Sequence, residues 1–108
     1  MFSGYRFMWL LVMFDLPVLS KAERKEASEF RMSLLDEGFH MVQFSVYARC
    51  CTSPKQIDTY CTRIEGALPA GGEVQILQFT DKQYANIITY YGKKKQPAKK
   101  IPDQFSLF

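Results

Sequence analysis

The sequence predicts an α+β fold in which two helices cover one antiparallel sheet. Three observations predict it: a run of eight apolar residues near the start, two amphipathic stretches that begin with helix-capping residues, and further segments in which apolar and polar residues alternate. Apolar runs and period-two alternation are typical of strands, whereas spacings of three and four residues are typical of helices. A length of 108 residues favours a single domain.

The first strand and the first helix occupy the first third of the chain. Residues 7–14 (FMWLLVMF) form a continuous apolar segment, as expected of a central strand that is buried on both faces. Pro17 ends this strand because its nitrogen has no hydrogen to donate. A helix over residues 21–37 is predicted by Ser20, which has a glutamate three positions on, and by Gly38, which suits the left-handed end of a helix.

The middle of the chain contains two strands and the second helix. Residues 39–51 alternate between apolar and polar residues but are too long for one strand, so we expect a tight reversal at residues 43–45. Ser53 as the N-cap and Pro54 in the first turn begin the second helix. Spacings of four, three and four residues predict its buried stripe: Ile57, Cys61, Ile64 and Leu68.

The last third of the chain contains one more strand and a basic tail. Residues 73–79 predict a strand, and residues 80–91 predict a capped turn followed by a short closing strand. The resulting order is βαββαβ with an additional C-terminal strand, which is a ferredoxin-like sandwich. We assign residues 1–92 to this domain and residues 93–108 to a basic C-terminal arm.

The arm combines a lysine-rich linker with an apolar end. Five lysines lie between Lys93 and Lys100, and the chain then closes on the apolar segment 105–108. An apolar terminal segment suits addition to the edge of a partner's sheet, and a disordered tail is the alternative.

Composition and charge exclude several classes of protein. The chain lacks the roughly 20 consecutive apolar residues of a membrane-spanning helix and a secretory cleavage site after residues 7–14, so we expect a cytoplasmic protein without a membrane partner. The net charge of +3 comes from the arm, because residues 1–92 carry 9 basic and 10 acidic residues. This balance favours local basic sites over a uniformly basic surface.

The three cysteines do not predict a disulfide framework. Their number is odd, and Cys50 and Cys51 are adjacent, so they point to opposite faces of a strand. Buried thiols in a reducing compartment are favoured over a zinc site formed by Cys50, Cys61 and His40.

Asp15 is the strongest candidate for chemistry. It directly follows the apolar run and therefore lies where the first strand leaves the core. Mg²⁺ prefers oxygen ligands and often uses only one or two carboxylates, and a second copy of Asp15 from a twofold-related chain would make a better site. The alternative is that Asp15 caps the turn at Leu16 and Pro17. His40 is the only histidine, which leaves a single base for any Ser–His or Cys–His pair.

Several basic side chains are candidates for contact with nucleic-acid phosphates. Arg24 and Arg31 are two helical turns apart, so both could face one phosphate backbone, and Arg49 is a further candidate. The densest cluster consists of consecutive lysines: Lys93, Lys94 and Lys95. The alternatives are surface salt bridges for the arginines and a solubilising tail for the lysines.

Four segments together resemble a known family. They are WLLVMFDLPV (9–18), ERKEASEFR (23–31), LLDEGFHMVQFSVYARCC (34–51) and LPAGGEVQILQFTDKQY (68–84). They occur in the order and spacing of that family and cover about residues 7–92. The sequence resembles the small CRISPR-associated endonuclease that accompanies the CRISPR integrase during spacer acquisition, in the variant found with type II systems.

The resemblance implies a ferredoxin-like homodimer whose sheets face each other and whose last strands cross to the partner's sheet. It implies that Asp15 is the metal-binding catalytic residue, with its two copies near the dimer axis. The family's catalytic serine maps onto Ser45, and the neighbouring aromatic residue onto Phe44 or Tyr47. Arginines early in the first helix are matched only loosely, by Arg24.

The function implied by the resemblance is a Mg²⁺-dependent endonuclease acting on single-stranded RNA or double-stranded DNA. Such proteins also form the central dimer of the spacer-integration complex with the CRISPR integrase. Two alternatives stay open: a non-catalytic scaffold that sets the spacing of DNA for the integrase, and a related ferredoxin-like toxin nuclease.

Overall fold

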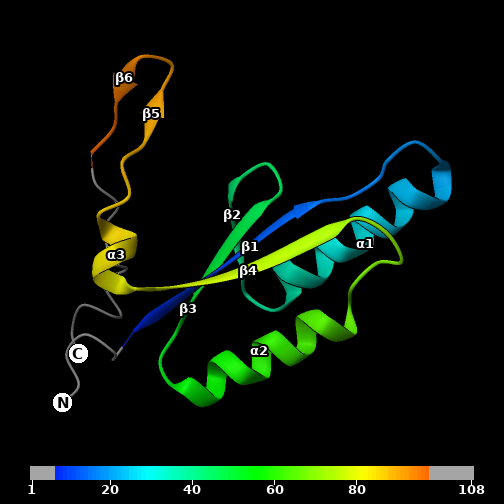
Figure 1. The fold of residues 1–108 in the computed structure, drawn as a ribbon, viewed down its shortest axis with the longest axis horizontal. Coiled ribbons are helices and arrows are strands. Elements are labelled where there is room, and N and C mark those ends of the chain that lie inside the picture. Colours follow the sequence, from blue (N-terminus) through cyan, green and yellow to red (C-terminus); the bar gives the residue numbers. More distant parts are fainter. Residues whose placement is uncertain (1–6, 98–108) are drawn as a thin grey trace.

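The computed structural model describes residues 7–97, which form a four-stranded antiparallel sheet with two long helices on one face (Figure 1). In chain order the elements are β1 (Met8–Asp15), α1 (Lys21–Asp36), β2 (His40–Gln43), β3 (Val46–Cys51), α2 (Pro54–Gly66), β4 (Glu73–Thr80), α3 (Asp81–Ala85), β5 (Tyr90–Tyr91) and β6 (Lys94–Lys95). The strand order in the sheet is β2-β3-β1-β4, which confirms the predicted ferredoxin-like sandwich.

β1 is the central strand, as its apolar run predicts. It pairs with β3 from Met8 to Met13 and with β4 from Met8 to Asp15. Leu10 and Val12 have no exposed surface, because strands cover β1 on both sides and helices cover the face that these two residues occupy. The last residue of β1, Asp15, is exposed.

The two faces of the sheet carry separate apolar clusters. On the face that α1 and α2 cover, Phe14 packs edge-on against Phe30 with ring centroids 5.2 Å apart. The opposite face, called the open face below, carries the buried residues Phe7, Trp9, Leu11, Ala48, Cys50 and Tyr84. Cys50 and Cys51 belong to different clusters, which confirms that the adjacent thiols point to opposite faces.

The two long helices begin at the predicted capping residues. The Ser20 hydroxyl accepts a hydrogen bond from the Glu23 N–H at 3.0 Å, and the Glu23 carboxylate accepts one from the Ser20 N–H at 2.9 Å. Ser53 caps α2 by accepting from the Gln56 N–H at 3.2 Å. The predicted stripe of α2 is wrong at its end, because Leu68 lies beyond the helix and is 46% exposed.

The reversal predicted within residues 39–51 is confirmed at Phe44 and Ser45, between β2 and β3. Ser45 has a φ of +63°, a left-handed conformation that few residues other than glycine adopt. This turn brings the start of β3 beside the end of β1.

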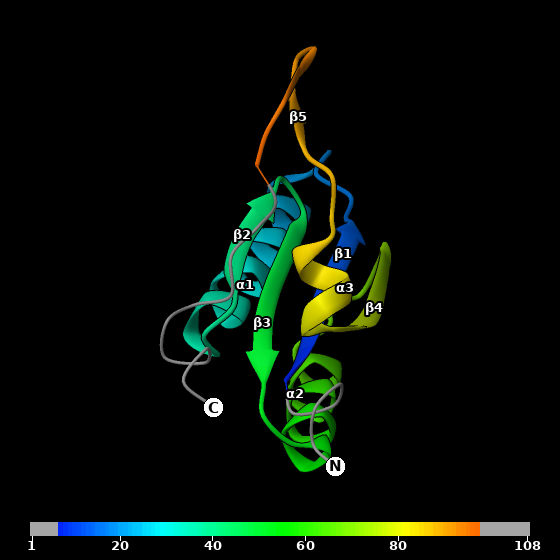
Figure 2. The same cartoon turned by 90° about the vertical axis from the view of Figure 1, so that its left-hand side faces the viewer.

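The predicted capped turn at residues 80–83 continues into α3. Tyr84 of α3 stacks on Trp9 with ring centroids 4.0 Å apart, so α3 covers part of the open face where it lies against β1 and β4 (Figure 2). A short helix forms here because Thr80 and Gln83 make a capping box.

The closing strand predicted over residues 87–91 is confirmed only at its end, where it forms β5, and it does not join the main sheet. Within the described residues, only Tyr90 and Tyr91 of this segment belong to a strand, and they pair with Lys95 and Lys94 in a hairpin that projects away from the sheet (Figure 1). The domain boundary that we placed between residues 92 and 93 falls in the turn of this hairpin. The apolar segment 105–108 lies outside the described residues.

No helix in residues 7–97 has the length and apolar character needed to cross a bilayer.

Gly38 gives a stability prediction. Its φ is +86°, and a Cβ atom there would lie 2.6 Å from Nη1 of Arg49. We expect Gly38→Ala to lower the free energy of unfolding by about 1–2 kcal/mol, because an L side chain is strained at this φ. Urea unfolding followed by circular dichroism measures the change, and Gly66→Ala, where an added Cβ meets nothing within 4 Å, is the control. Equal stabilities of the two variants would contradict the prediction.

Candidate functional site

Asp15 and Ser45 lie at the same end of the sheet. They share a pocket of about 220 Å³ whose lining is Met13, Phe14, Asp15, Phe44, Ser45, Val46, Glu73 and Gln75. The Phe14 N–H donates a hydrogen bond to the Ser45 carbonyl at 3.0 Å, which ties the β2–β3 turn to the end of β1. The structure therefore brings together the two residues that the resemblance implies are catalytic.

Glu73 is a pocket residue that the sequence analysis missed. It is the register partner of Asp15 in the antiparallel pair of β1 and β4. Directly opposite residues have Cβ atoms about 4.5–5.5 Å apart, so two exposed carboxylate side chains start side by side on neighbouring strands. Glu73 is identified by the register of β4 against β1. The alternation of apolar and polar residues within 73–79 predicts a strand but does not reveal which of its residues lies opposite Asp15.

The pocket opens on the open face of the sheet. Side chains alternate along a strand, and Phe14 belongs to the helix-side core, so Asp15 and Met13 point the other way. On β4 the same rule applies, because Val74 packs with the helix-side core and Glu73 precedes it. Both carboxylates therefore lie on the face that α1 and α2 leave uncovered.

The structure distinguishes the two aromatic candidates beside Ser45. Tyr47 is 2% exposed and stacks against Phe14 in the helix-side core, so it is a core residue. Phe44 is 91% exposed and lines the pocket. An exposed aromatic ring beside a carboxylate is a surface on which a nucleobase can stack.

The charge of the pocket favours a cation. Its described lining contains two carboxylates, Asp15 and Glu73, and no basic side chain. Like charges directly opposite in a sheet repel each other, and a bound cation would relieve that repulsion. No group of three or more His, Cys, Asp or Glu side chains placed to hold a metal ion occurs within residues 7–97.

Arg24 and Arg49 make contacts within the protein. Nη1 of Arg24 donates to the carbonyls of Val18 and Leu19 at 3.1 Å each, which holds the loop between β1 and α1. The Arg49 side chain donates to the Glu37 carbonyl and, through Nε, to the Cys50 carbonyl at 3.1 Å.

The Arg49 guanidinium also lies 4.1 Å from the ring centroid of Tyr60. These contacts give Arg49 a structural role at the end of α1, and its contact with nucleic acid stays a prediction.

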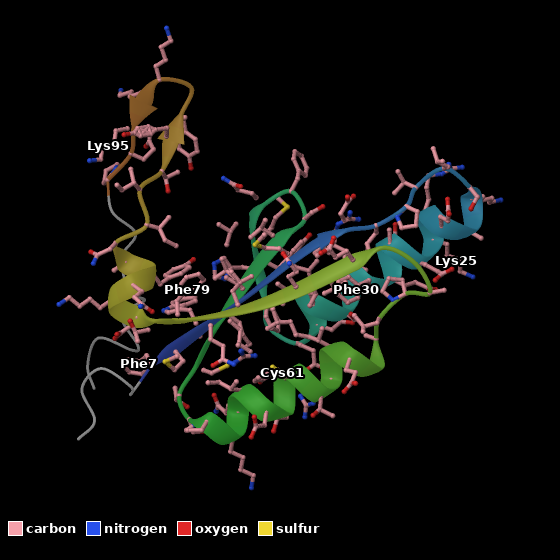
Figure 3. All side chains as sticks on the ribbon, in the orientation of Figure 1. Phe7, Lys25, Phe30, Cys61, Phe79 and Lys95 are labelled. Carbon is pink, nitrogen blue, oxygen red and sulfur yellow. The ribbon has the colours of Figure 1, made fainter. Side chains whose placement is uncertain are left out.

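The remaining basic candidates are not brought to the pocket. Arg31 is partly exposed on α1, and Lys93, Lys94 and Lys95 are exposed on the hairpin. Figure 3 shows Lys95 on the hairpin and Lys25 on α1 at opposite sides of the molecule. The two groups of basic residues therefore lie on different parts of the surface.

The cysteines give a prediction for stability at high pH. Burial raises the pKa of Cys50 to about 12 and also raises the pKa of Cys51 and Cys61. Thiols of the unfolded chain ionise from about pH 9, before those of the folded chain, so stability should be intact below pH 9 and fall as the pH rises toward 12. Urea unfolding between pH 8 and 10.5 measures this fall. Cys50→Ala should reduce its slope, and an unchanged slope would contradict the assignment.

The class of protein is defined by the strand order, by the two helices on one face of the sheet, and by Asp15 at the end of the central strand with Glu73 beside it. It is a ferredoxin-like domain with an acidic pocket on the open face of its sheet. The chain belongs to the family of the CRISPR associated protein Cas2, whose model matches residues 8–87. This confirms the family that the sequence resembles.

Two relatives and one solved structure illustrate the similarity. The chain is 63% identical over 108 residues to the CRISPR-associated endoribonuclease Cas2 of Paracidovorax avenae, with 100% of both chains covered. It is 46% identical over 106 residues to the CRISPR-associated endoribonuclease Cas2 of Flavobacterium psychrophilum, covering 98% of this chain and 92% of that one. A crystal structure of Cas2 matches with a TM-score of 0.58 and 20% identity, over 89% of this chain and 99% of that chain, and shows the same fold.

Proposed function

We propose that the protein is a Mg²⁺-dependent endonuclease of the CRISPR adaptation machinery and that Asp15 from two copies of the chain carries its chemistry. The observation that carries the proposal is the position of Asp15, exposed at the end of the central strand and in register with Glu73. The relatives are named endoribonucleases, which supports phosphodiester hydrolysis with RNA among the substrates.

The side chains of the pocket fit Mg²⁺. This ion takes oxygen ligands and commonly binds through one or two carboxylates, with water and substrate phosphates completing its shell. Asp15 would hold the ion, and Glu73 is the neighbouring carboxylate on β4. Bound there, Mg²⁺ would supply an acidic water and offset the charge that develops on the phosphate.

Each of the other pocket residues has a role that follows from its chemistry. The Ser45 hydroxyl can donate to a phosphate oxygen and so orient the scissile group beside Asp15. The exposed ring of Phe44 can stack on the adjoining base and hold the strand across the pocket. Positioning of this kind contributes to the rate because the reacting atoms are already aligned when they bind.

A homodimer through the open face would complete the site. α3 covers only part of this face, and partly exposed apolar side chains lie on the remainder: Met13, Val42, Val46 and Leu77. Two copies related by a twofold axis would bury these residues against each other and bring the two Asp15 carboxylates to the axis. The CRISPR integrase is the proposed further partner of this dimer.

Nucleic acid would also be held outside the pocket. Lys93, Lys94 and Lys95 are exposed together on the hairpin, and Arg31 is partly exposed on α1. Such side chains contact phosphates without reading sequence, so they suit both double-stranded DNA and single-stranded RNA.

The test is cleavage by the wild-type chain with and without metal. Purified protein is incubated with end-labelled single-stranded RNA and double-stranded DNA over a Mg²⁺ titration, with EDTA and Ca²⁺ as controls. We expect cleavage of at least one substrate that rises with Mg²⁺ and stops on addition of EDTA. Absence of cleavage of both substrates at every Mg²⁺ concentration would contradict the proposal.

A non-catalytic scaffold for the integrase is the second candidate. It is favoured by the separation of the basic side chains from the acidic pocket, because a spacing device needs phosphate contacts but no catalytic centre. An integration assay with the integrase distinguishes the candidates: a scaffold retains integration after Asp15→Asn, whereas a requirement for hydrolysis removes it.

A further inference from the structure

The backbone of Asp15 is packed against a glycine, and any other residue at that position would displace the neighbouring chain. Gly72, the residue before β4, has a φ of +91°. A Cβ atom there would lie 2.6 Å from the carbonyl oxygen of Asp15 and 2.9 Å from Cδ2 of Leu16. Contacts this short with backbone atoms do not occur in proteins, so a larger residue would push the end of β1 away.

The other glycines of the described chain show that this contact is specific. A Cβ at the adjacent Gly71 would approach no closer than 3.5 Å, to Cγ of Pro17, which is ordinary contact. A Cβ at Gly38 would also lie 2.6 Å from an atom, but that atom is Nη1 of the Arg49 side chain and not a backbone atom. Of these three glycines, Gly72 alone is pressed against the backbone at the acidic pocket.

The end of β1 is held from its other side as well. There the Phe14 N–H donates to the carbonyl of Ser45, whose φ is +63°. Two left-handed residues, one before β4 and one before β3, therefore flank the last two residues of β1. Glu73, directly after Gly72, is the register partner of Asp15.

From this arrangement we infer that Gly72 is a positioning residue for Asp15. The inference rests on the proposed function. The bare Cα of Gly72 lets the chain pass beneath the Asp15 carbonyl and enter β4 with Glu73 beside Asp15. A side chain at position 72 would shift the Asp15 backbone and so change the distance between the carboxylates of Asp15 and Glu73. Metal binding should therefore weaken, although no side chain of the pocket has been changed.

The experiment compares Gly72→Ala with Gly71→Ala and Gly38→Ala. Gly71→Ala controls for an added methyl group in the same turn, and Gly38→Ala controls for backbone strain away from the pocket. Gly72→Asn is a second variant at the position, because asparagine tolerates a positive φ while its Cβ still meets Asp15. Thermal unfolding sets an assay temperature at which every variant is folded.

Two readouts separate positioning from stability. The first is binding of Mn²⁺, used as the probe for Mg²⁺, followed by paramagnetic broadening of backbone amide signals. The second is the Mg²⁺ concentration for half-maximal cleavage. We expect Gly72→Ala and Gly72→Asn to raise the Mn²⁺ concentration for half-maximal binding and the Mg²⁺ concentration for half-maximal cleavage at least tenfold. Gly71→Ala and Gly38→Ala should leave both concentrations within twofold of the wild type.

The outcomes distinguish the positioning role of Gly72 from the nuclease function. Metal affinities of the Gly72 variants equal to that of Gly71→Ala, with all proteins folded, would overturn the positioning role. Loss of affinity in Gly38→Ala to the same extent would also overturn it, because backbone strain anywhere would then suffice. The wild-type protein could also cleave neither RNA nor DNA while the Gly72 variants bind Mn²⁺ more weakly than it does. That result would support the positioning role and reject the nuclease function.

Discussion

Replacing Asp15 by asparagine should lower Mg²⁺-dependent cleavage by at least about 100-fold, since stabilisation of transition-state charge by a metal ion amounts to several kcal/mol and about 1.4 kcal/mol is a tenfold change in rate. Asparagine preserves the size of the side chain and removes its charge. Asp15 is exposed at the end of β1, so the substitution should change the free energy of unfolding by less than about 0.5 kcal/mol. Single-turnover cleavage of the substrate found for the wild type measures the effect.

Asp36→Asn is the matched control for this variant. Asp36 is an exposed carboxylate at the end of α1, in the helical layer and outside the pocket. Its replacement removes the same charge and should leave the cleavage rate within twofold of the wild type. Equal cleavage by Asp15→Asn and Asp36→Asn would reject Asp15 as the metal-binding residue.

A charge on the open face should separate the proposed dimer and remove cleavage with it. Val42 is partly exposed on β2 and packs against the open-face cluster, beside the pocket but outside its lining. Val42→Asp would place a carboxylate from each copy in a desolvated interface, where juxtaposed like charges cost several kcal/mol. We expect the dimer to dissociate at concentrations at least about 100-fold higher than for the wild type. Sedimentation velocity over a dilution series measures this.

Met32→Asp is the control for the dimer variant. Met32 is 54% exposed on α1, so the change adds the same charge to the helical side of the molecule. It should leave both self-association and cleavage unchanged. A Val42→Asp protein that stays dimeric at the dilution where the wild type is dimeric would contradict an interface on the open face.

Most of the fold could be predicted because its signals are local. The apolar run of β1, the capping box at Ser20 and the Ser53–Pro54 start of α2 each act within a few residues, and each element forms where it was expected. The region after β4 was harder to predict. The aromatic and β-branched residues 87–91 resemble a strand, but only Tyr90 and Tyr91 of this segment pair as a strand, with Lys95 and Lys94 that follow them.

The site was predicted in part, for a similar reason. Asp15 stands out because a carboxylate follows eight apolar residues, and the resemblance to the family adds Ser45. Glu73 and Gly72 are distant in sequence, and only the pairing of β4 with β1 brings them to Asp15. The contacts of Arg49 depend on how α1 ends, so its spacing in the sequence does not reveal its structural role.

A mixed dimer tests most directly the central claim that two copies of Asp15 form one site. Wild-type and Asp15→Asn chains with different affinity tags are coexpressed, and the dimer carrying one of each is isolated by two successive affinity steps. Its cleavage rate is compared with those of the two homodimers at the same Mg²⁺ concentration. If both carboxylates serve one site, the mixed dimer should retain less than a tenth of the wild-type rate. A mixed dimer that cleaves at half the wild-type rate would show that each chain acts alone.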